Sequence, residues 1–146
     1  MNPLTANEGP PGTTCASCVW QFVGGRGRAV PRCRRHHNAR VDPAWAGCES
    51  HEVSLDCVAC GACCREAYHR VELSRRDPFL ALHPERVTQD EGYLLVTRDG
   101  ARCGCLQIAA GRHTCAVYED RPWTCREFER GGANCADARR RVGLTR

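Results

Sequence analysis

Thirteen cysteines in 146 residues constrain this chain more than any other feature of its sequence. Tryptophan, tyrosine and phenylalanine contribute only three residues each, and the mean hydropathy is −0.50. A small domain with so little apolar material usually depends on disulfides or bound metal to stay folded. The use of the cysteines therefore decides what the chain folds into.

Metal binding explains the cysteines better than disulfides do. The stretch before Cys15 is rich in proline and glycine and has no apolar run, so we expect a disordered tail over residues 1–14 and no signal peptide. No later stretch approaches the length of a membrane span, so we expect no membrane partner and a cytoplasmic location. In a reducing cytoplasm, an odd number of closely spaced cysteines more often binds metal or performs redox chemistry.

The formal net charge of +4 invites a nucleic-acid interpretation, but the cysteines weaken it. A site in which four thiolates hold one zinc ion carries a net charge of about −2, so the basic residues can offset buried thiolates. The arginine-rich runs at 31–37 and 138–141 also lack the interleaved aromatic residues on which bases stack. We therefore expect metal ions or a cluster as partners, and no nucleic acid.

A first module over residues 15–52 carries four cysteines, of which the first two form a C-x2-C pair: Cys15, Cys18, Cys33 and Cys48. The pair forms a tight turn whose sulfurs can grip one metal ion, and the later two complete a tetrahedral set. Glycines at 24, 25 and 27 predict a loop or hairpin tip between the pair and the third cysteine. His36 and His51 are either substitute ligands or surface residues, and the complete cysteine set favours the second alternative.

The second segment, residues 53–146, is expected to form a cysteine-cluster metal-binding domain. Its patterns predict strands at 68–73 and 114–118, a strand pair around residues 98–100 and a last short helix at 135–143. They also predict a helix from Ser74 that Pro84 ends, and a helix over 119–130 that Asp120 caps. The expected fold class is a small α+β protein, loop-rich and stapled by metal, with short β-hairpins and a few short helices.

Residues 57–64 read CVACGACC, in which two C-x2-C turns share their middle cysteine. Gly61 relieves backbone crowding in this run. Neighbouring side chains of an extended chain point to opposite faces, so we expect Cys63 and Cys64 to serve two different metal environments. Cysteines further along the chain would supply the remaining ligands.

This run, followed by CLQI, TCAVYEDRPWTCREFE and a final cysteine, resembles the CxxCxxCC family, a bacterial group (YkgJ-type) of zinc- or iron-chelating domains. The resemblance covers about residues 57–135. It implies that eight cysteines are metal ligands: Cys57, Cys60, Cys63, Cys64, Cys105, Cys115, Cys125 and Cys135. Cys103 falls outside the pattern, and we interpret it as a spare thiol that is either redox-responsive or inert, with the inert alternative favoured.

The resemblance implies binding of an iron–sulfur (4Fe–4S) cluster or zinc without fixing a role. We expect electron transfer, redox sensing or metal handling, with a redox protein as partner. The alternative is a zinc-stapled module that binds protein or nucleic acid without redox chemistry. No dinucleotide, phosphate-loop or serine-hydrolase motif is present, so the sequence assigns no catalytic residue. The first module resembles, more weakly, high-potential iron–sulfur proteins or a zinc knuckle, so both metals stay open there.

Overall fold

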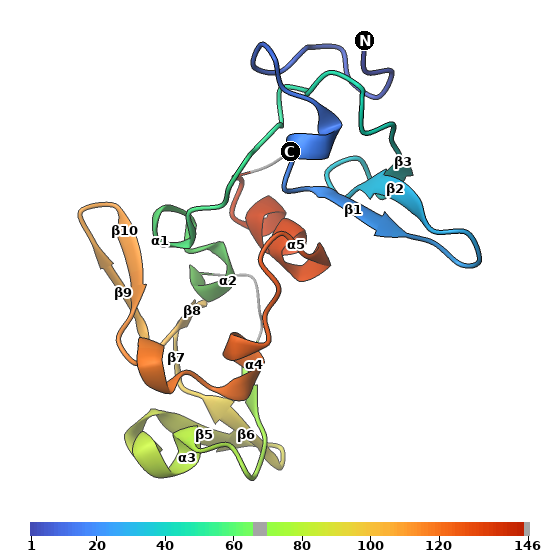
Figure 1. Ribbon diagram of the computed structural model, residues 1–146. Helices are drawn as coiled ribbons and strands as arrows, with labels where there is room; N and C mark the ends of the chain where they lie inside the picture. Colours follow the sequence, from blue (N-terminus) through green and yellow to red (C-terminus); the bar gives the residue numbers. More distant parts are fainter. Residues whose placement is uncertain (66–69, 145–146) are drawn as a thin grey trace. The chain divides into compact units, whose positions relative to one another are not determined.

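The computed structural model describes residues 1–65 and 70–144, and the chain forms two compact units. The first comprises Met1–Leu55 and Arg130–Ala136, and the second comprises Asp56–Glu129 and Asp137–Arg146 (Figure 1). The division after Leu55 lies close to the boundary after residue 52 that the sequence predicts. The sequence does not predict that residues 130–136 return to the first unit.

A three-stranded antiparallel sheet forms the regular part of the first unit. Strand β1 (Gln21–Gly24) pairs with β2 (Val30–Cys33), which pairs with β3 (Ala39–Arg40), and a 3-10 turn, η1 (Cys15–Ser17), precedes the sheet. The predicted glycine tip joins β1 to β2, and its Gly25 and Gly27 have φ of +141° and +80°, which favour glycine. Trp20, between η1 and β1, is fully buried and donates its Nε1–H to Glu52 Oε2 at 2.6 Å.

The first fourteen residues contain no helix or regular strand, yet they have packing partners within the first unit. Glu8 forms an isolated β-bridge with Cys48. The Asn2 side chain is only 3% exposed, and its Nδ2 donates to Ala46 O at 3.3 Å and to Cys15 Sγ at 3.6 Å. The segment that the sequence predicts as a disordered tail thus lies against the cysteine loops of this unit.

Short elements build the second unit, in this order: α1 (Cys57–Cys60), α2 (Ala62–Arg65), β4 (Glu72–Leu73), α3 (Phe79–Leu82), η2 (Pro84–Arg86), β5 (Val87–Asp90), β6 (Tyr93–Val96), β7 (Arg98–Asp99), β8 (Arg102–Cys103), β9 (Leu106–Ala109), β10 (Arg112–Cys115), η3 (Tyr118–Asp120), α4 (Trp123–Arg126) and the later part of α5 (Ala133–Arg141). One antiparallel sheet has the order β4-β6-β5, and the hairpins β7–β8 and β9–β10 follow it. The predicted fold class, a small α+β protein with short antiparallel hairpins and a few short helices, is confirmed.

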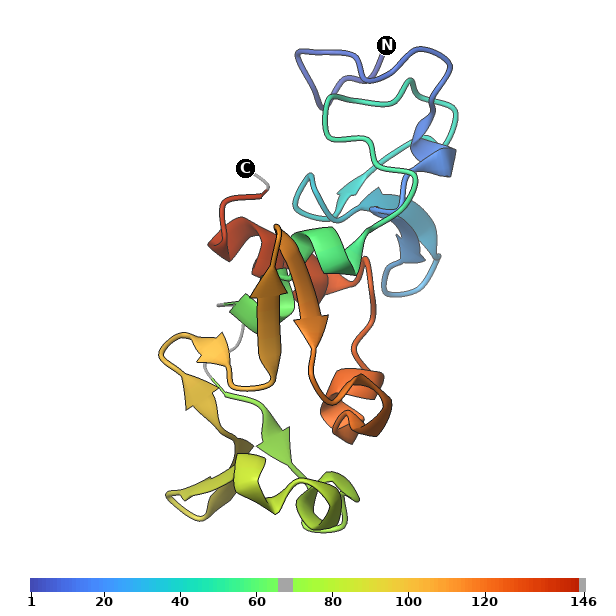
Figure 2. The same cartoon turned by 90° about the vertical axis from the view of Figure 1, so that its left-hand side faces the viewer.

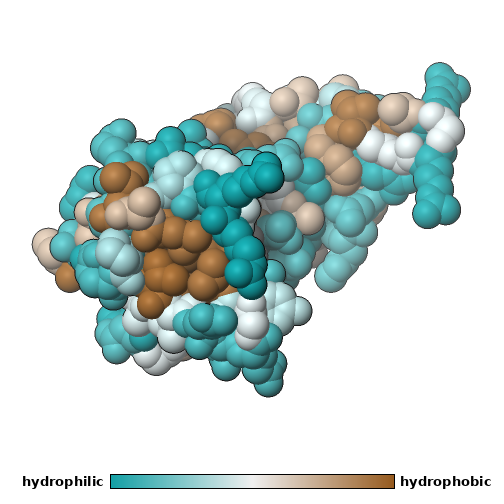
Figure 3. Space-filling model, turned by 90° about the horizontal axis from the view of Figure 1, so that it is seen from below, coloured by the Kyte–Doolittle hydropathy of each residue, from teal (hydrophilic) through white to brown (hydrophobic). Residues whose placement is uncertain are grey.

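The apolar core of the second unit is small and includes a thiol. Its buried members are Leu73, Phe79, Val96, Cys105 and Val117. An apolar area also reaches the surface at the end formed by α3, β5 and β6 (Figure 3), where Leu82 and Tyr93 are exposed. With so thin a core, we expect the stability of the unit to depend on what its cysteines bind.

Helices α3 and α4 are shorter than predicted and share one capping residue. Helix α3 begins after Pro78 rather than at Ser74, and α4 is a single turn. The carboxylate of Asp77, which is 4% exposed, serves both: Oδ1 accepts the Phe79 N–H at 3.0 Å, and Oδ2 accepts the Trp123 N–H at 2.9 Å. A cap supplied from 46 residues away is invisible to a local sequence pattern.

Most other short elements match their patterns. The hairpin around residues 98–100 and the last helix are confirmed as β7–β8 and α5. The strand predicted at 68–73 is present as β4, and residues 68 and 69 lie outside the described part of the chain. The prediction that Asp120 caps α4 is wrong, since its Oδ2 lies 3.0 Å from His83 Nε2. Among the described residues, no helix is long and apolar enough to cross a membrane.

Candidate metal centres

The CVACGACC run folds as two one-turn helices joined by a left-handed glycine. Asp56 caps α1, because its Oδ1 accepts the N–H groups of Val58 and Ala59 at 3.0 and 3.1 Å. Gly61 ends α1 with φ of +59°, a conformation that costs other residues about 1–2 kcal/mol. The chain then turns at once into α2, which carries the two adjacent cysteines.

Gly61 also allows a close approach to the second hairpin. Helix α1 packs against β10, as both ribbon views show (Figure 1 and Figure 2). A Cβ atom at residue 61 would lie 2.3 Å from Cγ of His113, and His113 Nδ1 lies 3.2 Å from Val58 O. Glycine is therefore required between α1 and the strand that carries Cys115.

Cys63 and Cys64 lie close together, and the expectation of opposite faces is wrong. That expectation assumed an extended backbone, whereas the pair lies on helix α2, where neighbours differ in direction by only about 100°. Their Sγ atoms are 4.0 Å apart. Two ligands that each lie about 2.3 Å from a tetrahedral zinc ion are about 3.8 Å apart, so the spacing of this pair suits one ion.

Six thiols of the second unit interact with one another, and they form what we call the six-thiol group: Cys63, Cys64, Cys103, Cys105, Cys115 and Cys125. They come from α2, from β8 and the turn after it, from the end of β10 and from α4. Helix α2 packs against β8, which brings the pair Cys63 and Cys64 close to the pair Cys103 and Cys105. Ionisation of one thiol raises the pKa of its neighbours, so several thiolates can coexist here only beside a cation.

Cys103 belongs to the six-thiol group and is not an isolated thiol. It interacts electrostatically with each of the other five. A hydrogen bond from the Cys105 thiol, backbone N–H groups of Cys105 and Leu106, and the charge of Arg98 lower its pKa to about 6 despite its burial. The close C-x-C spacing is the one sequence signal that could have placed Cys103 beside its partner, since the family pattern omits it.

Burial and mutual interaction raise the pKa values of most other members. Hydrogen bonding to its partner on β8 raises the pKa of Cys105, and burial adds to that effect. Burial raises the pKa of Cys115 and brings that of Cys125 to about 12. In the α2 pair, the hydrogen bond between the thiols lowers the pKa of Cys63 to about 7 and raises that of Cys64. A bound cation would replace the proton that each pair shares.

Arginine side chains near the six-thiol group favour its ionised forms. Arg98 acts on Cys103, Arg86 acts on Cys105 and Cys115, and Arg121 acts on Cys115 and Cys125. Each of these charges lowers the pKa of the thiol that it faces, although burial outweighs it at Cys115 and Cys125. The arginines thus offset part of the negative charge that several thiolates would bring.

The remaining cysteines of the family pattern occupy helices α1 and α5. Cys57, at the start of α1, is exposed, and Cys60, at its end, packs with Cys63 against Ala62 and Ala138. Cys135 is buried in the first turn of α5, in the segment that belongs to the first unit. Their role as ligands stays a prediction.

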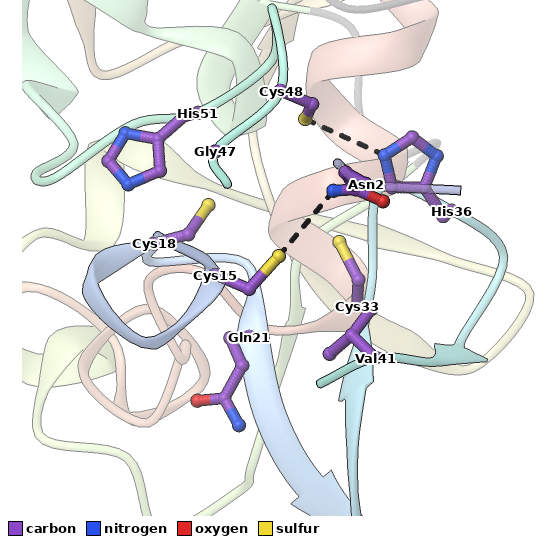
Figure 4. Close-up of a pocket in the computed structure, with 10 residues that line it drawn as sticks. All are labelled: Asn2, Cys15, Cys18, Gln21, Cys33, His36, Val41, Gly47, Cys48 and His51. Carbon is purple, nitrogen blue, oxygen red and sulfur yellow. Dashed lines mark hydrogen bonds between the residues drawn. The ribbon is translucent and has the colours of Figure 1, made fainter. Parts of the chain in front are cut away.

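In the first unit, the four predicted ligands line one small cavity together with both histidines. Figure 4 shows the arrangement of Cys15, Cys18, Cys33, Cys48, His36 and His51. Burial raises the pKa values of Cys15, Cys33 and Cys48, and the neighbouring thiols raise them further. Asn2 also lines the cavity, which the sequence does not predict because it lies in the expected tail.

The donor sets of both units suit thiolate-binding metals. All thirteen cysteines lie within the described residues and form no disulfide. Thiolates bind zinc and iron–sulfur clusters alike, so the chemistry fits either group. In the described ranges, no three His, Cys, Asp or Glu side chains stand close enough to hold a metal ion as placed, so the sulfur atoms must move inward to bind one.

The six-thiol group and the CVACGACC run define a cysteine-cluster domain. Residues 56–141 match the CxxCxxCC family, described as "Putative zinc- or iron-chelating domain", and the chain belongs to this family. It is also 33% identical over 103 residues to the "Uncharacterized protein YkgJ" of Escherichia coli O157:H7, a match that covers 61% of this chain and 93% of that protein. No solved structure matches the chain. The resemblance drawn from the sequence is confirmed.

Proposed function

We propose that the second unit binds an iron–sulfur cluster, or zinc, through thiolates of the six-thiol group together with Cys57 and Cys60. The chain then serves electron transfer, redox sensing or metal handling in the reducing cytoplasm. The observation that carries this proposal is the mutual interaction of six thiols from four separate segments. A single tetrahedral ion needs only four ligands, so this number favours a polynuclear group.

The surroundings of the six-thiol group support a redox role. Cys105 is buried and the other five thiols are half-buried, which limits the access of water, and nearby arginines offset thiolate charge. Both factors tune the potential of a cluster. When bound, an iron–sulfur cluster would supply one-electron chemistry. Tyr118 and Trp123, which are 56% and 42% exposed, flank the turn before Cys125 and offer a contact face for a redox protein.

A zinc-stapled interaction module is the second candidate. The backbone N–H groups of Cys105 and Leu106 donate hydrogen bonds to the Cys103 sulfur. Such bonds stabilise a thiolate that binds a single zinc ion as well as one that binds a cluster, so they are compatible with this module. Any four members of the six-thiol group would complete its tetrahedral set. Such a module would bind a protein or a nucleic acid without redox chemistry.

Anaerobic purification of the full chain, followed by metal and sulfide analysis and a visible spectrum, separates these functions. Iron with inorganic sulfide and broad brown absorption supports the redox proposal. A colourless protein that carries zinc in the second unit supports the interaction module. Cys125→Ser should lose the metal of this unit, whereas Thr88→Ser, on the exposed face of β5, should retain it. If Cys125→Ser carries as much metal as the wild-type chain, both the redox function and the interaction module are refuted.

A further inference from the structure

The cavity of the first unit has the size and the lining of a site for one metal ion. Four thiols line it (Figure 4), and Cys15, Cys33 and Cys48 are buried while Cys18 is half-buried. Its volume of about 10 Å³ corresponds to roughly one water-sized sphere. A space of this size can take one small ion once the sulfur atoms move inward onto it.

Hydrogen-bond donors point at three of the four sulfurs. Asn2 Nδ2 lies 3.6 Å from Cys15 Sγ, and His36 Nε2 lies 3.6 Å from Cys48 Sγ. Backbone N–H groups of His36 and Arg35 bond to the Cys33 sulfur, and that of Ser50 bonds to the Cys48 sulfur. Donors of this kind stabilise thiolates and orient them, as the outer-shell partners of metal ligands do. Thiols that serve only as apolar core residues do not require such hydrogen-bond donors.

Both histidines make hydrogen-bond contacts through Nε2, which leaves the four cysteines as the candidate ligands. His51 Nε2 lies 3.1 Å from Thr14 O, so it carries a proton there and donates to that carbonyl, and Ser17 Oγ lies 2.9 Å from the same nitrogen. His36 directs its Nε2 at a sulfur rather than at the cavity itself. Four thiolates around one small space are the donor set of a structural zinc site.

The first unit needs such an ion, because little else fills its core. Among residues 1–55, the buried apolar positions are Cys15, Trp20, Cys33, Val41 and Cys48. Three of these five are the cavity thiols themselves, and Arg130–Ala136 adds only Cys135 and Ala136 to the buried apolar positions of the unit. Domains with so little buried material are usually held by a metal ion.

We propose that Cys15, Cys18, Cys33 and Cys48 bind one zinc ion at a structural site of the first unit. The family match begins at residue 56, so this site lies outside the part of the chain that the family describes. The ion would tie η1, the end of β2 and the loop at Cys48 together. It is independent of the metal proposed for the second unit.

The test counts zinc and iron per chain in the full-length protein, purified anaerobically with a thiol reductant. Cys33→Ser should lose one zinc ion per chain and keep the metal of the second unit. Cys125→Ser is the matched control, and it should keep this zinc ion whatever it loses elsewhere. The test compares the zinc content of Cys33→Ser with that of the wild-type chain and of Cys125→Ser, so it remains valid even if the second unit binds no metal. Zinc content unchanged by Cys33→Ser, or loss of iron in its place, would overturn the proposal.

Two measurements do not depend on how well Cys33→Ser folds. X-ray absorption at the zinc edge of Cys125→Ser should give a shell of four sulfur atoms at about 2.3 Å, and a shell that includes nitrogen or oxygen would contradict the assignment. Asn2→Ala keeps all four ligands and should weaken zinc binding in a chelator competition by about 10-fold or more. An unchanged zinc affinity would count against the site.

Discussion

At the scale of single residues, Cys103 shows most clearly how a motif differs from a site. The family pattern omits it, yet it interacts with every other member of the six-thiol group. We expect Cys103→Ser to lower the metal content of the full chain as strongly as Cys105→Ser does, because both changes remove a thiolate from the same group. Metal analysis of the anaerobically purified variants measures this.

The control for Cys103 is Ala101→Ser, in the exposed turn of the same hairpin, which should keep the wild-type metal content. It separates loss of a ligand from damage to the hairpin. If Cys103→Ser binds as much metal as wild type, Cys103 is the spare thiol that the sequence favours.

At the scale of secondary-structure elements, the corner between α1 and α2 depends on Gly61. We expect Gly61→Ala to destabilise the metal-loaded chain by about 2–5 kcal/mol, because it adds a left-handed alanine and a clash with His113 on β10. Denaturant unfolding followed by circular dichroism gives the free-energy difference. The corner also aims the α2 cysteines, so metal content should fall with stability.

Gly100 offers a matched control for Gly61. It has the same φ of +59° in the β7–β8 turn, but no atom lies within 4 Å of the Cβ that an alanine would add. Gly100→Ala should therefore cost only the backbone term, about 1–2 kcal/mol. If Gly61→Ala and Gly100→Ala lower the free energy of unfolding equally, the close approach of β10 to α1 contributes nothing to the effect of Gly61→Ala.

Asp77 couples α3 to α4 through its two carboxylate oxygens. We expect Asp77→Ala to lower the free energy of unfolding by about 2 kcal/mol or more, because it leaves the N–H groups of Phe79 and Trp123 without their acceptor. Asp99→Ala is the control, since its carboxylate is 80% exposed and reaches Arg102 only at 3.5 Å; its effect should stay within about 0.5 kcal/mol. A change at Asp77 as small as that at Asp99 would exclude the shared cap.

Local patterns predict elements correctly where the causes are local. The β7–β8 hairpin follows from the turn at Gly100, and α5 follows from its own run of helix-forming residues. That the four cysteines of the first module lie together was also predictable, and all four line one cavity. The helical form of the α2 pair was not predictable, because it depends on a turn that competes with extended backbone. The remote cap from Asp77 was not predictable either, because it joins segments distant in sequence.

At the scale of the whole molecule, stability should depend on bound metal. Removal of metal by a chelator, under reducing conditions, should abolish most of the circular dichroism signal, because site formation in structural zinc domains supplies about 10 kcal/mol or more of folding free energy. The thin cores of both units are the reason for this expectation. Re-addition of metal should restore the signal, whereas a metal-free chain that unfolds cooperatively from a native-like state would contradict the prediction.

The return of Arg130–Ala136 to the first unit has a consequence for how the chain is made. The glycine at 131 comes close to the backbone of Val19, so the late segment is part of the fold that the earliest residues begin. During synthesis, the ribosome releases the cavity thiols long before it releases this segment, and Asp56–Glu129 of the second unit emerges between the two. The unit whose translation begins first therefore lacks part of its fold until all but the last ten residues of the chain have been synthesised.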